Sequence, residues 1–96
     1  MLGKVHEFEG KKIFASCDKE LIEKKIITDD FEIYFSKSFY GDKEIDVDQI
    51  IKNIKECDSS NIFGKKICSL LIKKKVITEE TIIYIEDVPH LQIYKV

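Results

Sequence analysis

Apolar residues recur at helical spacing over residues 46–57, so this stretch is the clearest predicted helix. Asp46 stands where an N-terminal cap is needed, and Gln49 three positions later completes a capping box. Ile45 and Ile50 occupy the two positions of a hydrophobic staple. The buried stripe of this helix would consist of Val47, Ile50, Ile51, Ile54 and Cys57.

A second amphipathic pattern runs over residues 59–85 and predicts a polar cap, a helix, a short link and a strand. Residues 59–61 (SSN) accept hydrogen bonds from the free N–H groups at a helix start, so they are the predicted cap. Gly64 would lie in the first turn, where glycine costs roughly 1 kcal/mol relative to alanine. Close packing or a closely approaching ligand would have to offset that cost. The helix would bury Phe63, Ile67, Leu70 and Leu71.

Two segments of the chain resemble each other. Residues 21–35 (LIEKKIITDDFEIYF) and 71–85 (LIKKKVITEETIIYI) align without a gap. The match predicts one structural unit used twice, in which the end of a helix runs into a strand. Convergence in a chain crowded with Ile and Lys is the alternative explanation.

Runs rich in β-branched and aromatic residues predict five strands, of which four are joined into hairpins. Residues 9–11 (EGK) form the first hairpin turn, and residues 86–89 (EDVP) connect the last two strands. Asp18 would cap a short helix. Residues 36–43 would form a loop whose aromatic residues anchor it to the core or provide a contact surface. The predicted strands are residues 3–8, 12–17, 31–35, 81–85 and 90–96.

Mixed helices and strands with two hairpins indicate an α+β two-layer sandwich, a mostly antiparallel sheet with helices packed on one face. The 96 residues are predicted to form a single domain, 1–96. The open face of the sheet could stack on unpaired bases or receive a protein partner. Ordinary half-exposed tyrosines, or coverage by a second copy of the chain, are the alternatives. Strand alternation would place Tyr34, Tyr84, His90, Gln92 and Tyr94 on this face.

The charge and the cysteine content limit which ligands and which cellular compartment are expected for this protein. The net charge of −2 gives no overall field that favours nucleic acid or membranes. The chain has no arginine, so phosphate contacts would use lysine or backbone N–H groups. Three cysteines without a CxxC pair are typical of free thiols in a reducing compartment, and no signal peptide or membrane span is recognisable, so we expect a cytoplasmic protein. Many Lys and Glu with few Asn and Gln are typical of a thermophile.

Two places could carry chemistry. The helix start at residues 61–66 (NIFGKK) would offer free N–H groups beside two lysines, an arrangement that binds anions, although capping and a packing glycine explain the same residues. Cys17 and His90 would make a nucleophile and a base, but nothing in their spacing supports this, and Cys17 is expected in the core. No metal site and no cofactor are predicted, because the three Cys and two His are scattered.

Four short motifs, in this order and spacing, resemble the archaeal family called domain of unknown function 424. They are residues 15–18 (ASCD), residues 39–41 (FYG), the pair Asn61 and Gly64, and residues 88–92 (VPHLQ). The resemblance covers nearly the whole chain and implies an archaeal, cytoplasmic, α/β two-layer protein associated with translation genes. The chain has Glu23 and Glu86-Asp87 where the family pattern has glycine. The family's motif positions map onto Tyr40, Gly41, Asn61, Gly64, Pro89, His90 and Gln92.

The leading hypothesis is a small non-catalytic binding module for RNA or a translation-related protein. One alternative is an enzyme that acts on a small anionic substrate with His90 as acid–base, and another is a homodimeric interaction protein. The chain would be a monomer or a homodimer without a membrane partner. In the leading hypothesis Asn61, Gly64, Lys65 and Lys66 hold phosphate. The predicted binding residues are Tyr40, Gly41, Asn61, Gly64, Lys65, Lys66, His90 and Gln92.

Overall fold

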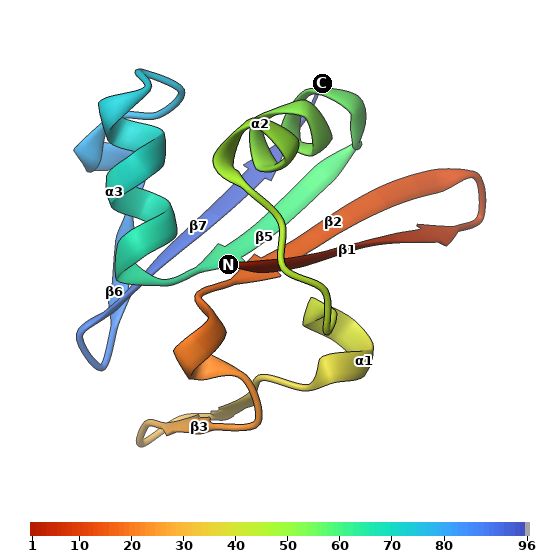
Figure 1. Ribbon diagram of the computed structural model, residues 1–96. Coiled ribbons are helices and arrows are strands. Elements are labelled where there is room, and N and C mark those ends of the chain that lie inside the picture. The colour runs from red at the N-terminus through yellow and green to blue at the C-terminus, as the bar shows by residue number, and fades with distance from the viewer. Residues whose placement is uncertain (96) are drawn as a thin grey trace.

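A computed structural model describes residues 1–95 and shows a five-stranded sheet with helices on both sides (Figure 1). The pairing of β2 with β5 is parallel and every other pairing in this sheet is antiparallel. The predicted α+β class and mostly antiparallel sheet are confirmed. Across the sheet the strands are β1 (Leu2–Phe8), β2 (Lys11–Cys17), β5 (Ser59–Phe63), β7 (Val88–Tyr94) and β6 (Ile83–Ile85).

Both predicted hairpins are present, and both have two-residue turns. Glu9 and Gly10, with φ of 51° and 78°, join β1 to β2. Glu86 and Asp87, with φ of 48° and 67°, join β6 to β7. Two successive positive φ values are those of the type I′ turn, whose twist matches that of the flanking strands.

The two long helices, α2 (Val47–Glu56) and α3 (Lys65–Lys73), pack on the same face of the sheet (Figure 1). The predicted capping box of α2 is present: Asp46 accepts from the Gln49 N–H, and the Gln49 side chain accepts from the Asp46 N–H, both at 2.9 Å. The core on this face contains Phe14, Ile50, Ile54, Cys57, Ile62, Ile67, Cys68, Leu71, Ile82 and Leu91.

The prediction that residues 59–61 cap a helix was wrong. These residues belong to β5, which lies at the centre of the sheet between β2 and β7. Ile62 is fully buried on the helix side and Phe63 is buried on the other side, as expected of a strand covered on both faces. The chain then turns at Gly64, which has a φ of 133° and directly precedes α3.

The other face of the sheet is partly covered by residues 19–40, whose elements were predicted only in part from the sequence. The 3-10 helix η1 (Lys19–Leu21) leads into a two-stranded sheet of β3 (Lys25–Ile27) and β4 (Glu32–Tyr34). The predicted loop at residues 36–43 contains a short helix, α1 (Lys37–Tyr40), capped by Ser36. The second core, beneath this cover, contains Ala15, Cys17, Ile26, Phe35, Tyr40 and Phe63.

The two similar segments do not form the same structure. Residues 25–27 form β3, whereas residues 75–77, at the equivalent positions, lie in the connection that follows α3. That connection continues into the 3-10 helix η2 (Glu79–Thr81) before β6. The shared pattern thus reflects similar local composition, and neighbouring elements decide how each copy folds.

Strand register tests which residues occupy the open face. Leu91 and Ile93 pack in the core beneath the helices, and alternation places His90, Gln92 and Tyr94 on the opposite face, as predicted. Tyr84 is opposite Pro89 in the β6–β7 pair, so it lies on the helix side, and its predicted position was wrong. The two-residue turn at Glu86 and Asp87 sets the register of β6 against β7, and this register cannot be deduced from alternation within each strand alone. Val96, the last residue of the predicted strand, lies outside the described residues.

Candidate functional site

Three of the predicted site residues come together on the face opposite α2 and α3. His90 of β7 and Asn61 of β5 are joined by a hydrogen bond of 2.9 Å between Nε2 and Oδ1. The His90 ring also stacks on Phe63, with a centroid distance of 3.9 Å and an interplanar angle of 6°. Tyr40 of α1 packs edge-on against Phe63 at 6.3 Å, and its phenol interacts with Asn61.

The hydrogen bonds assign the protons in this cluster. A carbonyl oxygen only accepts, so Nε2 of His90 carries the hydrogen and Nδ1 presents a lone pair. Burial lowers the pKa of His90 below its usual value, so the ring is neutral at pH 7. Burial raises the pKa of Tyr40 to about 12, an effect that a hydrogen bond from Asn61 partly opposes.

The cluster therefore consists of neutral groups. It also lies beside Cys17, which is fully buried and belongs to the same core as Tyr40. Burial, followed by the charge of Asp18, raises the pKa of the Cys17 thiol to about 12, so no thiolate forms at neutral pH. As expected from the sequence, Cys17 is part of the core.

The N-terminus of α3 is occupied by a carboxylate of the protein itself. The Asp18 oxygens accept hydrogen bonds from the N–H groups of Lys66, at 2.8 Å, and Ile67, at 3.0 Å. A Cβ on Gly64 would lie 2.3 Å from Cγ of Asp18. The cost of glycine here is thus offset by close packing of Asp18. A phosphate at this helix start would compete with Asp18, and only the exposed side chains of Lys65 and Lys66 would be free to contact it.

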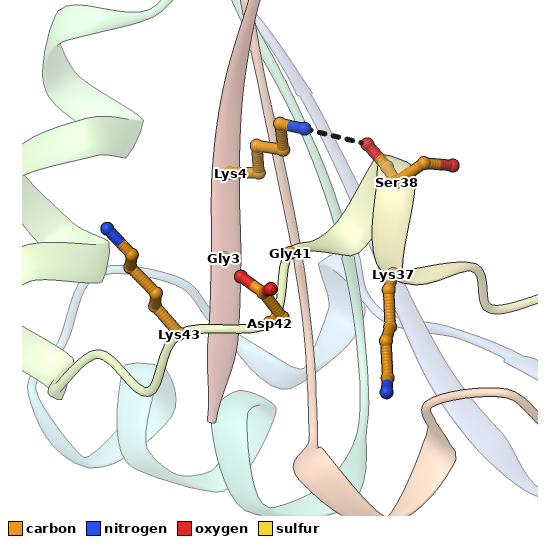
Figure 2. A pocket seen from close by; sticks show the side chains of 7 residues that line it. All are labelled: Gly3, Lys4, Lys37, Ser38, Gly41, Asp42 and Lys43. Carbon is orange, nitrogen blue, oxygen red and sulfur yellow. Dashed lines mark hydrogen bonds between the residues drawn. The ribbon is translucent and has the colours of Figure 1, made fainter.

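Gly41 also has a packing role. Its φ is 93°, and a Cβ on it would lie 2.6 Å from the carbonyl oxygen of Gly3 in β1. A hollow of about 430 Å³ opens at this contact. Figure 2 shows that the lysine side chains around it point in different directions, and Lys4 Nζ donates to the Ser38 carbonyl at 3.2 Å. The hollow is lined by Gly3, Lys4, Lys37, Ser38, Gly41, Asp42 and Lys43.

Part of the sheet face that carries His90 is left uncovered. Phe8 and Tyr94 are 68% and 71% exposed, and both line a hollow of about 340 Å³ above β1, β2, β5 and β7. Nearer the cover, His6 of β1 stacks on Phe39 at 4.8 Å and donates from Nε2 to the Phe39 carbonyl at 2.7 Å. Alternation from His6 would have placed Phe8 on this face, but it was not singled out. The hollow is lined by Phe8, Glu9, Lys11, Ile13, Asp58, Ser59, Tyr94 and Lys95.

The predicted binding residues therefore do not form a single site. Tyr40, Asn61 and His90 meet, and Gln92 lies beside Asn61 as its partner in the β5–β7 ladder. Residues 64–66 lie beyond the end of β5, and they connect to the cluster through the backbone, where the Gly64 N–H donates to the Pro89 carbonyl at 3.0 Å. Gly41 faces β1.

Two further observations concern the described residues as a whole. Within residues 1–95, no group of three or more His, Cys, Asp or Glu side chains is placed to hold a metal ion. In the same part of the chain, none of the helices combines the length and the apolar character that crossing a bilayer requires.

A family described as "Protein of unknown function (DUF424)" matches residues 6–96. The chain belongs to this family. The resemblance carried by the sequence motifs is thereby confirmed. A comparison with curated proteins finds no match to the chain.

The DUF424 chain is similar in structure to an uncharacterized conserved protein from Methanopyrus kandleri, solved by crystallography. The TM-score is 0.79, the sequence identity is 24%, and the alignment covers 97% of this chain and 89% of that chain. At this identity the likeness supports the fold.

Proposed function

We propose that this DUF424 protein is a small non-catalytic binding module that takes up single-stranded RNA on the uncovered part of its sheet. The observation that carries the proposal is the pair of exposed aromatic side chains, Phe8 and Tyr94, on one hollowed sheet face. Exposed aromatic side chains on a sheet are a common platform for unpaired bases, because every base has a face that stacks.

The surroundings of this aromatic pair fit the same ligand. β1 and β7 are separated by β2 and β5, so the two rings stand roughly 14 Å or more apart by strand spacing and would take different bases. Asn61, His90 and Gln92 lie on this face and offer hydrogen-bonding groups to base edges.

Positive charge at the hollow comes from lysine. Lys11 and Lys95 line it and would contact phosphate as point charges. The nearby Asp58 carboxylate accepts a hydrogen bond of 2.8 Å from the Lys12 N–H, which reduces its repulsion of a phosphate. Lys65 and Lys66 would contact RNA that continues past the end of β5.

The supporting residues act indirectly in this proposal. Tyr40 is only 4% exposed, so it would influence RNA through Asn61 rather than by contact. Gly41 holds α1 against β1. The family resemblance implies an association with translation genes, and we therefore propose RNA as the nucleic acid to test first.

The test compares two exposed tyrosines on opposite faces of the sheet. We expect Tyr94→Ala to weaken binding of a labelled single-stranded RNA by about five- to 150-fold, the equivalent of one lost stacking contact of about 1–3 kcal/mol. Tyr84→Ala is the matched control, since Tyr84 is 58% exposed but lies on the helix side. Fluorescence anisotropy at low salt measures both affinities.

Salt dependence provides a second measurement on the same complex. Lys11→Gln should reduce the slope of log K against log salt by about 0.7, as expected for one lost phosphate contact to a single strand. Equal losses in the two tyrosine variants, or no binding at low salt, would overturn the proposal.

The Asn61–His90 hydrogen bond favours one second candidate, an enzyme that acts on a small anionic substrate with His90 as acid–base. The bond fixes the ring and leaves Nδ1 as a potential base. Titration with inorganic phosphate, followed by NMR of the His90 ring, tests it. An enzyme site would shift these signals at millimolar phosphate, and unchanged signals would exclude a bound anion beside His90.

A further inference from the structure

The outer edge of β7 is only half paired. β6 covers residues Val88, Pro89 and His90 of β7, and the β6–β7 pairing ends there. Residues 91–94 continue as a strand whose inner edge pairs with β5 over its whole length. The last part of β7 therefore forms an edge of the sheet, although β6 lies beyond it in the strand order.

The hydrogen bonds at both ends of β7 show which backbone groups lie on this edge. The Pro89 carbonyl accepts from Gly64, at 3.0 Å, and the Lys95 N–H donates to Asp58, at 2.9 Å, so both groups point towards β5. By alternation Leu91 and Ile93 also point towards β5, whereas Gln92 and Tyr94 direct their N–H and C=O groups outwards. Among the described residues, no backbone partner reaches these four groups.

A groove runs along this free edge. Its volume is about 500 Å³, and its far wall is the connection after α3. The groove exists because the chain before β6 turns inwards at Ile82, which is 9% exposed, instead of continuing to pair with β7. The lining residues are Lys75, Val76, Ile77, Thr78, Thr81, Leu91, Gln92, Ile93 and Tyr94.

We propose that an extended, acidic segment of a partner protein binds in this groove as an additional strand paired with residues 91–94 of β7. Free N–H and C=O groups at strand spacing are matched by an extended polypeptide backbone, which is how strand addition to sheet edges gains its affinity. The inference does not rest on the proposed RNA surface, because it uses the backbone edge of β7, although the side chains of Gln92 and Tyr94 lie on the sheet face.

The charges beside the groove favour an acidic segment. Lys75 lines the groove, and Lys73 and Lys74 precede it at the end of α3. The three ion pairs among the described residues involve other lysines, namely Lys19, Lys25 and Lys37.

The acidic groups nearby are directed elsewhere. Glu79 lines a different hollow, between α3 and β6. The Glu80 carboxylate accepts hydrogen bonds from its own backbone N–H and from the Thr78 hydroxyl, which lowers the pKa of Glu80. Glu80 is not among the residues that line the groove, and Lys75 is the charged residue that does.

Hydrogen exchange tests the free edge directly. In the protein alone, the amides of Gln92 and Tyr94 should exchange at least tenfold faster than those of Leu91 and Ile93, measured by NMR. The probe for binding is a synthetic peptide in which valine or threonine alternates with glutamate. Its addition should slow exchange at Gln92 and Tyr94 at least tenfold.

Two substitutions at one position separate the backbone from the side chain. Gln92→Pro removes the outward N–H, a change that an edge position tolerates, and should abolish peptide binding. Gln92→Ala retains the N–H and should bind the peptide within about twofold of the original chain. Lys75→Gln should weaken binding by about two- to fivefold, and so should replacing the glutamates of the peptide with lysine.

Each contrary result is identifiable. Equal protection of all four amides in the free protein, or equal binding by the two Gln92 variants, would overturn the proposal. Protection of Gln92 and Tyr94 that depends on protein concentration without peptide would show that a second copy of the chain occupies the edge instead. RNA binding that Lys75→Gln leaves intact would confirm that the groove is separate from the RNA surface.

Discussion

At the scale of single residues, Gly64 and Asp18 pack closely against each other. The carboxylate that caps α3 occupies the space that any side chain at position 64 would need. Two structural requirements, a helix cap and a turn at the end of β5, are thus met by one contact between residues 46 positions apart.

Substitution of Gly64 by alanine should therefore be unusually costly. The new Cβ would meet Asp18 at 2.3 Å and would force a non-glycine residue to a φ of 133°, so we expect a loss of about 3 kcal/mol or more in the free energy of unfolding. Gly10→Ala is the matched control, because its φ is 78° but nothing lies within 4 Å of its Cβ, and it should cost about 1–2 kcal/mol. Urea unfolding measures both. Similar losses would show that the Asp18 contact contributes nothing.

The local cap of α2 could be predicted from the sequence, whereas Asp18, predicted to cap the short helix that follows it, caps the distant α3 instead. Asp46 and Gln49 are three residues apart, so their reciprocal hydrogen bonds follow from spacing alone. The side chain that caps α3 comes from Asp18 in a different part of the chain. Residues 59–61 have the composition of a cap, and without knowledge of Asp18 they were the natural candidates.

At the scale of elements, the two type I′ hairpins use different residues for the same turn. The β1–β2 turn has Gly10 in its second position, and the β6–β7 turn has Asp87 there, at a φ of 67°. This is one of the positions at which the DUF424 pattern was expected to have glycine, and the backbone conformation explains that preference.

Asp87→Gly should therefore stabilise the protein. Glycine adopts a positive φ without the steric cost that Asp87 has, and this gain outweighs the larger conformational entropy that glycine has in the unfolded chain. We therefore expect the free energy of unfolding to rise by about 0.5–1 kcal/mol. The reverse change in the other hairpin, Gly10→Asp, should cost a similar amount. Thermal unfolding of both variants checks the pair, and a loss of stability in Asp87→Gly would contradict this account of the turn.

The elements that were missed have a common cause. β5 is short and polar at its start, and its identity as a strand comes from pairing with β2 and β7, which are distant in sequence. β3 and α1 are three and four residues long, too short for periodicity to reveal. The helix α2 and the two hairpins, whose contacts are local, were predicted correctly.

At the scale of the whole molecule, the sheet has one face covered by α2 and α3 and another covered only in part (Figure 1). From the sequence, helices were expected on the first face, and the second face was expected to be open. The family resemblance, rather than hydrophobic periodicity, pointed to Tyr40, Asn61 and His90, which meet at the edge of the cover. Phe8 was not among the predicted site residues, although alternation along the first strand places it on the same face as His6.

The buried position of His90 should make global stability depend on pH. Because burial lowers the pKa of the folded state below the usual value of 6.5, the unfolded chain binds more protons below that pH. Stability should thus be unaffected by this group above about pH 6.5 and should fall as the pH drops from there towards the lower folded-state pKa.

His90→Gln isolates this contribution, since the glutamine amide can still donate to Asn61 while it does not titrate. The difference in unfolding free energy between the two proteins, measured in urea over about pH 7 to 5, should shrink or reverse as the pH falls. A difference that is constant with pH would contradict the assignment of a neutral, buried ring.

The order of strands in the sheet also has a consequence for how the chain is synthesised. β2 pairs with β5 across more than forty residues, and β7, which follows β5 and β6 in sequence, lies between them. A nascent chain can form the first hairpin early, but the centre of the sheet cannot be completed until β7 has been synthesised. A nascent chain that still lacks β7 would leave the β7-facing edge of β5 exposed to degradation and aggregation.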